Sequence, residues 1–202
     1  MIGVVDYGMG NLRSVEKALA RVGGDVRIVT GADEVRAAGK LVVPGVGAFG
    51  DCMRNLDRAG LREPIRQFAR SGKPFLGICL GFQALFDASE EAPGVAGLGV
   101  FEGSVPRFGV NGLKVPHMGW NQLKIQQPDC PLLAGVADGS YVYFVHSYYC
   151  APKSPKLICG VTDYGNEFCS MLWAGNVYAT QFHPEKSQAV GLKMLENFVR
   201  LA

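Results

Sequence analysis

The sequence predicts an α/β fold in which a mostly parallel sheet is followed by an antiparallel extension. The first half alternates short apolar runs with longer amphipathic ones, as strands and helices do when they take turns around a parallel sheet. After about residue 95 the pattern changes to strand-like runs separated by turns, which favours antiparallel pairing. The length of 202 residues suits a single domain, residues 1–202, with a core of its own.

The first half of the chain contains four predicted strands and two predicted helices. The strands are continuously apolar and rich in β-branched residues, as expected for strands buried on both faces, and they are Ile2–Asp6, Val26–Thr30, Leu41–Val43 and Pro74–Ile78. Apolar residues at three- and four-residue spacing predict the helices Leu12–Val22 and Leu61–Ser71. Glycines follow both helices and predict their ends.

The second half contains seven further predicted strands and a final helix. The strands are Leu98–Phe101, Gly112–Pro116, Asn121–Ile125, Tyr141–Val145, Leu157–Thr162, Cys169–Trp173 and Val177–Phe182. Ser187 is a candidate N-cap for the helix. Its apolar stripe consists of Val190, Met194, Leu195, Phe198 and Val199.

Composition and charge exclude several classes of protein. Hydrophobic residues make up 48% of the chain and charged residues 19%, which is typical of a globular protein and not of a disordered one. A net charge of +2 without a basic run argues against a nucleic-acid partner. Polar residues interrupt the longest charge-free stretch, 168–184, so no membrane span is expected. The first residues read as a strand and not as a signal peptide, so we expect a cytoplasmic protein.

The six cysteines are predicted to be thiols. They are residues 52, 79, 130, 150, 159 and 169, and they include no CxxC pair. A chain with a sufficient core does not need disulfides, and the spacing matches no zinc motif. We expect neither disulfides nor a metal site.

A nucleophile elbow is the sharpest local signal. Cys79 stands between Gly77 and Gly81, after an apolar strand and before the helical stretch Phe82–Phe86. The glycines remove Cβ atoms that would clash at such a turn, and the N-terminus of the helix favours a thiolate. The alternative is a buried structural cysteine.

A thiolate needs an acid for its leaving group, and the chain has three histidines. His183 is followed by Pro184 and Glu185, and in an extended segment residues two apart project to the same side. Glu185 can therefore orient His183, which makes Cys79, His183 and Glu185 a candidate triad. The alternative is an ordinary surface ion pair. His117 and His146 have no such partner, and a structural role is their default interpretation.

Two glycine-rich turns are candidates for backbone anion binding. Pro44–Gly47 ends the third strand, where open α/β sheets bind ligands, so an oxyanion hole or a simple tight turn is expected there. Gly8 and Gly10 follow the first strand, but Arg13 stands where a dinucleotide motif needs a third glycine. No acidic residue ends the second strand to hold a ribose. We expect no dinucleotide cofactor.

Six segments carry a resemblance to a known family. They are DYGMGNL at 6–12, PGVGAF at 44–49, GICLG at 77–81, PHMGWN at 116–121, YFVHSY at 143–148 and QFHPEKS at 181–187. The chain resembles the class I, or triad, glutamine amidotransferases. Within that family it is similar to the glutaminase subunits of imidazole glycerol phosphate synthases. The resemblance implies a three-layer, flavodoxin-like fold. One departure is Phe82, where related sequences usually carry Met.

The resemblance also implies a reaction. Cys79 would attack the side-chain amide of glutamine, His183 would give a proton to the departing ammonia, and Glu185 would orient His183. Water would then hydrolyse the γ-glutamyl thioester. Backbone N–H groups of Leu80 and of Val46–Gly47 would hold the oxyanion, the second donor after a peptide rotation. No cofactor or metal is implied.

A binding pocket and a partner follow from the same resemblance. The glutamine pocket would be lined by Gly47, Gln83, Glu91, Ser147 and Tyr148. Tyr143 and Lys186 would face the partner. That partner would be a cyclase subunit, a (β/α)8 barrel on a separate chain, which receives the ammonia within a heterodimer.

Three other functions stay open at this point. The chain could supply ammonia for anthranilate, aminodeoxychorismate or pyridoxal phosphate synthesis. It could instead be a cysteine peptidase or γ-glutamyl hydrolase that is active alone. A regulatory module with a degenerate triad is the third, and the intact Cys79, His183 and Glu185 argue against it.

Overall fold

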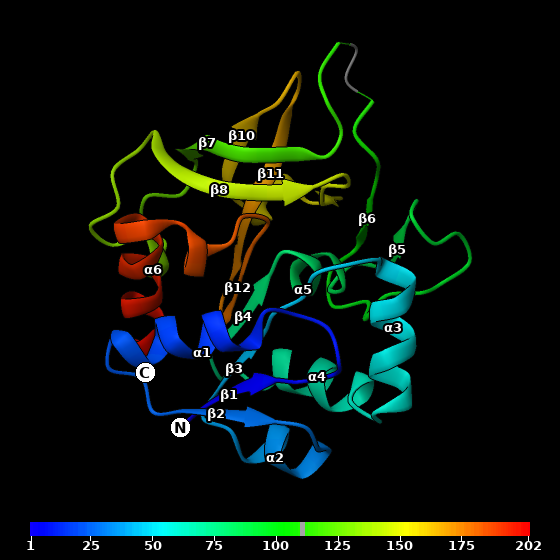
Figure 1. Ribbon diagram of the computed structural model, residues 1–202, viewed down its shortest axis with the longest axis vertical. Helices are drawn as coiled ribbons and strands as arrows, with labels where there is room; N and C mark the ends of the chain where they lie inside the picture. Colours follow the sequence, from blue (N-terminus) through cyan, green and yellow to red (C-terminus); the bar gives the residue numbers. More distant parts are fainter. Residues whose placement is uncertain (110–111) are drawn as a thin grey trace.

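A nine-stranded mixed sheet runs through the computed structural model, which describes residues 1–109 and 112–202 (Figure 1). The strand order is β2-β1-β3-β4-β12-β11-β10-β7-β8. From β2 to β12 each strand is parallel to its neighbour. From β12 to β8 each pair is antiparallel. The predicted parallel sheet with an antiparallel extension is confirmed, and β12 is the strand that joins the two parts.

The strands of the large sheet lie close to their predicted ranges. The parallel part consists of β1 (Ile2–Val5), β2 (Val26–Val29), β3 (Lys40–Val43), β4 (Phe75–Ile78) and β12 (Val177–Thr180). The antiparallel part adds β7 (His117–Ile125), β8 (Ser140–His146), β10 (Ile158–Asp163) and β11 (Glu167–Ala174). A small second sheet of β5 (Ala88–Ser89), β6 (Gly103–Val105) and β9 (Ala151–Pro152) was not predicted.

Helices cover both faces of the sheet. In Figure 1, α1 (Leu12–Arg21) and α6 (Gln188–Arg200) lie on one side of the parallel strands, and α3 (Phe49–Arg58) and α4 (Arg62–Ala69) lie on the other. The short helix α2 (Ala32–Ala37) packs against α4. Each helical layer packs on its own apolar cluster, one with α1 and α6 and one with α2, α3 and α4. The three layers expected from the resemblance are present.

Two predicted strands are wrong. Leu98–Phe101 is a loop in which Leu98 is buried and Val100 and Phe101 are partly buried. Its N–H groups donate to the backbone of the segment after β4: Leu98 to Ala84, and both Val100 and Phe101 to Leu85. Its apolar pattern therefore reflects burial and not a strand ladder. Gly112–Pro116 also forms no strand; its Leu113 is exposed, and the Lys114 carbonyl accepts a hydrogen bond from the Tyr164 hydroxyl.

Three helices differ from the prediction. Helices α2 and α3 were not predicted, and α5 covers Leu80–Gln83 instead of the predicted Phe82–Phe86. Helix α3 does carry an apolar stripe of Phe49, Cys52, Met53 and Leu56, so the signal was in the sequence.

The six cysteines are free and buried. Burial raises the pKa of the Cys52 thiol to about 11 and that of Cys169 to about 12. Ser187 does occupy the N-cap position of α6, but its hydroxyl donates to the His183 carbonyl and does not cap the helix. Within the described residues, none of the helices has the length and apolarity needed to span a bilayer.

Candidate active site

The site forms where β4 and β12 end side by side. The two strands are parallel, and Ile78 of β4 is opposite Thr180 of β12. The Cys79 N–H donates to the Thr180 carbonyl at 2.7 Å, which extends the pairing by one residue. The chain segments after both strands therefore leave the sheet at the same edge, where open α/β sheets bind their ligands. This register brings Cys79 and the segment with His183 together across about 100 residues of sequence.

Cys79 has the strained backbone expected of a nucleophile elbow. Its φ is 53° and its ψ is −105°, a region that residues other than glycine rarely adopt. The turn is tight because α5 begins at the next residue. A Cβ atom on Gly81 would overlap the Val43 carbonyl, and one on Gly77 would lie 3.0 Å from the Gly81 oxygen. Both flanking glycines are thus required by close backbone approach.

His183 and Glu185 are in contact, as the sequence predicts. His183 Nδ1 lies 2.8 Å from Glu185 Oε1, and the two side chains are only 2% and 1% exposed. The expected geometry of the segment is wrong, however, because Pro184–Lys186 forms a 3-10 turn instead of an extended segment. The pair is buried, so the alternative of a surface ion pair does not hold.

The electrostatics of His183 favour its protonated form. Burial is the largest influence and lowers its pKa, but the side chains of Cys79 and Glu185 together outweigh burial and raise the pKa to about 10. His183 therefore carries its proton at neutral pH. Among the described residues, its Nε2 atom is buried without a hydrogen-bond partner, which leaves that N–H available to a molecule at the sulfur.

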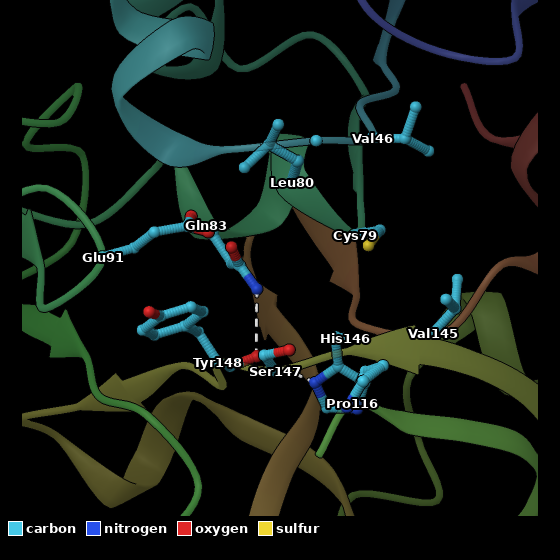
Figure 2. Close-up of a pocket in the computed structure, with 11 residues that line it drawn as sticks. Val46, Cys79, Leu80, Gln83, Glu91, Pro116, Val145, His146, Ser147 and Tyr148 are labelled. Atoms are coloured by element: carbon cyan, nitrogen blue, oxygen red, sulfur yellow. Dashed lines mark hydrogen bonds between the residues drawn. The ribbon is translucent and has the colours of Figure 1, made fainter.

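A cavity of about 260 Å³ opens beside Cys79 (Figure 2). Figure 2 shows Gln83, Glu91 and Tyr148 at one end and Cys79, Val46 and Val145 at the other. Every residue assigned to the oxyanion hole and to the glutamine pocket lines it, namely Val46, Gly47, Leu80, Gln83, Glu91, Ser147 and Tyr148. His183 and Glu185 are not among the lining residues, and their side chains are buried.

The polar end of the cavity is held by hydrogen bonds. Glu91 Oε2 accepts the Phe49 N–H at 2.7 Å, which fixes the carboxylate at the start of α3. Gln83 Nε2 donates to the Tyr148 carbonyl at 3.0 Å, the dashed line in Figure 2. A carboxylate at this end can hold a cationic group while a carbonyl carbon lies at Cys79. The cavity therefore suits a short molecule with a cationic end and an electrophilic end.

The two predicted oxyanion donors are not both aimed at the cavity. The Leu80 N–H donates to the Gly45 carbonyl at 3.4 Å, a long hydrogen bond. Gly47 has a φ of +104°, which a residue with a side chain rarely adopts, and Val46 is 38% exposed. A rotation of the peptide that turns the Gly45 carbonyl away would free the Leu80 N–H.

Sequence reasoning missed four residues of the site. Pro116, Val145 and His146 line the cavity, and the buried Gln181 donates from Nε2 to the Cys79 sulfur at 3.6 Å. The signal for Gln181 was a polar residue near the end of the predicted strand Val177–Phe182, just before His183. A structural role is the default interpretation of His146 from the sequence, and the structure shows that it also lines the cavity.

Tyr143 and Lys186 lie next to each other outside the cavity. Lys186 Nζ is 5.8 Å from the centre of the Tyr143 ring, within cation–π range. The Tyr143 backbone is tied to the active-site turn, since its carbonyl accepts the His183 N–H and its N–H donates to the Ser187 hydroxyl. Trp120 packs against the same ring, with 5.9 Å between the ring centres.

Comparison with known proteins finds relatives along nearly the whole chain. The imidazole glycerol phosphate synthase subunit HisH of Syntrophotalea carbinolica is 52% identical, with 98% of each chain covered. The subunit of the same name from Geobacter sulfurreducens is also 52% identical, covering 98% of this chain and 97% of that one. The subunit of the same name from Moorella thermoacetica is 49% identical, covering 99% of this chain and 94% of that one.

Solved structures share the fold at lower identity. A crystal structure described as a glutamine amidotransferase has a TM-score of 0.75 at 21% identity, with 98% of each chain covered. The structure of PurLQS from Thermotoga maritima has a TM-score of 0.74 at 20% identity, covering 98% of this chain and 96% of that one. Residues 3–202 match the family described as glutamine amidotransferase class-I. This match, together with relatives about half identical over nearly the full length, shows that the chain belongs to the class I glutamine amidotransferases.

Proposed function

We propose that this chain is the glutaminase subunit of an imidazole glycerol phosphate synthase, with residues 1–202 as one amidotransferase domain. The observation that carries the proposal is the convergence of Cys79 on its strained turn, the buried His183–Glu185 pair and the cavity with Glu91 at its far end. The names of relatives about half identical over the full chain support the choice of synthase.

The geometry leads to a two-step reaction. The Cys79 sulfur attacks the side-chain carbonyl carbon of glutamine and forms a tetrahedral oxyanion. Protonated His183 gives its Nε2 proton to the leaving nitrogen, the C–N bond breaks, and ammonia departs from a γ-glutamyl thioester. Neutral His183 then takes a proton from water, which attacks the thioester and releases glutamate and the Cys79 thiolate. Glu185 holds the ring through Nδ1 in both steps.

The cavity residues have separate roles in this proposal. Glu91 binds the α-ammonium group of glutamine, and Gln83, Ser147, Tyr148 and Gly47 complete the pocket. Backbone N–H groups of Leu80 and of the Val46–Gly47 region hold the oxyanion, and each well-placed donor is worth about 3–4 kcal/mol. Because Leu80 donates to Gly45 in this structure, we infer that full activity requires the peptide rotation.

The ammonia acceptor is a separate cyclase subunit, a (β/α)8 barrel, in a cytoplasmic heterodimer. An exposed apolar face beside the cavity supports a partner there: Met118 is 62% exposed and Trp120 46%. Met118 is opposite Val145, which lines the cavity, and Trp120 is opposite Tyr143. We assign Tyr143 and Lys186 to this interface. Direct transfer makes chemical sense because ammonia in water at neutral pH is mostly ammonium, which is not a nucleophile.

The deciding experiment is glutamate release from glutamine by the purified chain, alone and with an imidazole glycerol phosphate synthase cyclase subunit and its nucleotide ligand. Strong stimulation by the cyclase is expected. High activity that the cyclase does not change would point to another synthase or a stand-alone hydrolase. Inactivity of the complex as well would contradict the proposed function.

A further inference from the structure

His117 and His146 form a buried pair that the reaction above does not use. His117 Nδ1 lies 2.9 Å from His146 Nε2, and the two residues are opposite each other on β7 and β8. They are only 3% and 6% exposed. Burial lowers the pKa of His117 to about 4 and, as the largest of several influences, that of His146 to about 3. Both rings are therefore neutral at physiological pH.

One end of the pair specifies where the protons are. His146 Nδ1 lies 2.8 Å from the Tyr148 carbonyl oxygen, which can only accept a hydrogen bond. Nδ1 of His146 must therefore carry the proton. Since the ring is neutral, its Nε2 is an acceptor, and His117 Nδ1 must be the donor to it. His117 Nε2 is then left as an acceptor.

On the His117 side of the pair, Asn121 independently specifies the same direction of the hydrogen bonds. Asn121 Oδ1 accepts the Gln122 N–H at 2.8 Å and Nδ2 donates to the Asp163 carbonyl at 2.8 Å, so the orientation of the amide is determined. Its Nδ2 also lies 3.3 Å from His117 Nε2, where it can only donate. Asn121, His117 and His146 thus form a chain in which every hydrogen bond points toward Tyr148.

Aromatic rings keep both imidazoles in this orientation. His117 is stacked between Phe144, at 4.7 Å between centres, and Tyr164, at 4.0 Å. His146 packs against Phe108 and Phe168, with 5.2 Å between the ring centres in each pair. A ring flip would exchange donor and acceptor atoms and would have to displace these neighbours.

The chain of hydrogen bonds continues into the cavity. The Tyr148 carbonyl that accepts from His146 also accepts from Gln83 Nε2 at 3.0 Å. Gln83 Nε2 donates its second hydrogen to Gln181 Oε1 at 3.2 Å, and Gln181 Nε2 donates to the Cys79 sulfur. Because both bonds of the Gln83 amide use Nε2, its oxygen is left for a bound molecule.

We propose that His117 and His146 are positioning residues for glutamine binding. As neutral imidazoles with the proton on Nδ1, they hold the Tyr148 carbonyl, and through it the Gln83 amide, in the orientation that meets the substrate. The assignment rests on the proposed function, because Gln83 and Tyr148 are residues we assign to glutamine. His117 does not line the cavity, so its influence on binding passes through His146.

The tautomers can be measured without any assay of activity. Ring-nitrogen NMR of the ¹⁵N-labelled full chain at neutral pH should show both His117 and His146 as neutral with the proton on Nδ1. An Nε2 proton on either ring, or an imidazolium, would overturn the proposal.

Kinetics in the complex with the cyclase subunit test the consequence. His117→Leu removes both hydrogen bonds of the ring and should raise the KM for glutamine by about 5–10-fold, with kcat within about twofold of wild type. His117→Gln, whose amide can accept from Asn121 and donate to His146, should recover most of the affinity. The milder Asn121→Ala change at the half-buried end should raise KM by about threefold.

Thr162→Val is the matched control. It removes a buried hydrogen bond, Thr162 to Ser170, from neighbouring strands outside the histidine chain. It should lower Tm without raising KM. A KM for His117→Leu and Asn121→Ala within twofold of wild type, or an equal rise in Thr162→Val, would refute the positioning role. Failure of the wild-type complex to hydrolyse glutamine would instead refute the proposed function, and the NMR result would still report on the tautomers.

Discussion

The parallel and antiparallel parts of the sheet hold their active-site groups by different means. Cys79 and His183 follow two parallel strands, and backbone pairing, a strained turn and glycine contacts place them. Ser147 and Tyr148 follow an antiparallel strand, and side-chain hydrogen bonds from His146 and Gln83 hold that segment. Changes in the first region should therefore affect kcat or folding, and changes in the second should affect mainly KM.

The largest effect is expected at the nucleophile. Cys79→Ala should lower glutamine hydrolysis by about 10³-fold or more, because no other group forms the thioester. Partner binding and ammonia-dependent synthesis by the complex should stay intact. Glutamate release and product formation from ammonium salts measure the two reactions. Loss of the ammonia-dependent reaction as well would contradict the proposal that this chain only hydrolyses glutamine and that the cyclase subunit uses the ammonia.

Glu185→Gln tests the orientation of His183 by the buried carboxylate. It should lower kcat by about 10²-fold, because the amide does not stabilise the imidazolium. The carboxylate also raises the pKa of His183, so the alkaline limb of the pH–rate profile should move to lower pH. Glu63→Gln, at an exposed ion pair with Arg66, is the control and should leave both unchanged. An unshifted alkaline limb in Glu185→Gln would argue against His183 as the acid.

Gly81→Ala tests the close packing beneath the elbow. The added Cβ would overlap the Val43 carbonyl, and the resulting strain should cost about 3 kcal/mol of unfolding free energy. Tm should fall by about 6–12 °C in a thermal melt. Gly31→Ala is the control, since its Cβ would lie 3.7 Å from the nearest atom, Glu34 Oε2. Similar melting temperatures for the two variants would contradict the packing argument.

The free energy of unfolding should depend on pH in opposite ways through the buried histidines of the antiparallel part, His117 and His146, and through His183, which follows the parallel strand β12. The pKa values of His117 and His146 are lowered on folding, so their neutral forms stabilise the protein above the unfolded value of about 6.5, and this contribution is lost as the pH falls toward 4 and 3. His183 has a raised pKa, so its contribution is complete below about 6.5 and is lost as the pH rises through about 10.

Melting curves can separate these contributions. Between pH 7 and pH 4 the wild-type Tm should fall by about 5–10 °C. His146→Gln has no imidazole to protonate at that position, so its Tm should fall less over the same range. An identical fall in the two proteins would show that other groups cause the acid sensitivity.

The pattern of strands could be predicted from sequence because apolar periodicity reports burial directly. The ranges of β1–β4 and of the long antiparallel strands agree within a few residues. The same signal failed at Leu98–Phe101, where the apolar residues pack on the core from a loop. Periodicity does not distinguish a strand from another buried segment when the backbone hydrogen bonds go elsewhere.

The sequence by itself determined which residues are candidates for the chemistry, since Cys79 stands in the local motif Gly77–Gly81 and Glu185 follows His183 by two residues. Only the tertiary structure decided that Gln181 reaches Cys79 and that His117 and His146 connect strand β7 to the cavity. Those contacts depend on strand register and side-chain orientation across more than 20 residues of sequence. A local pattern carries no information about them, because long-range pairing sets both.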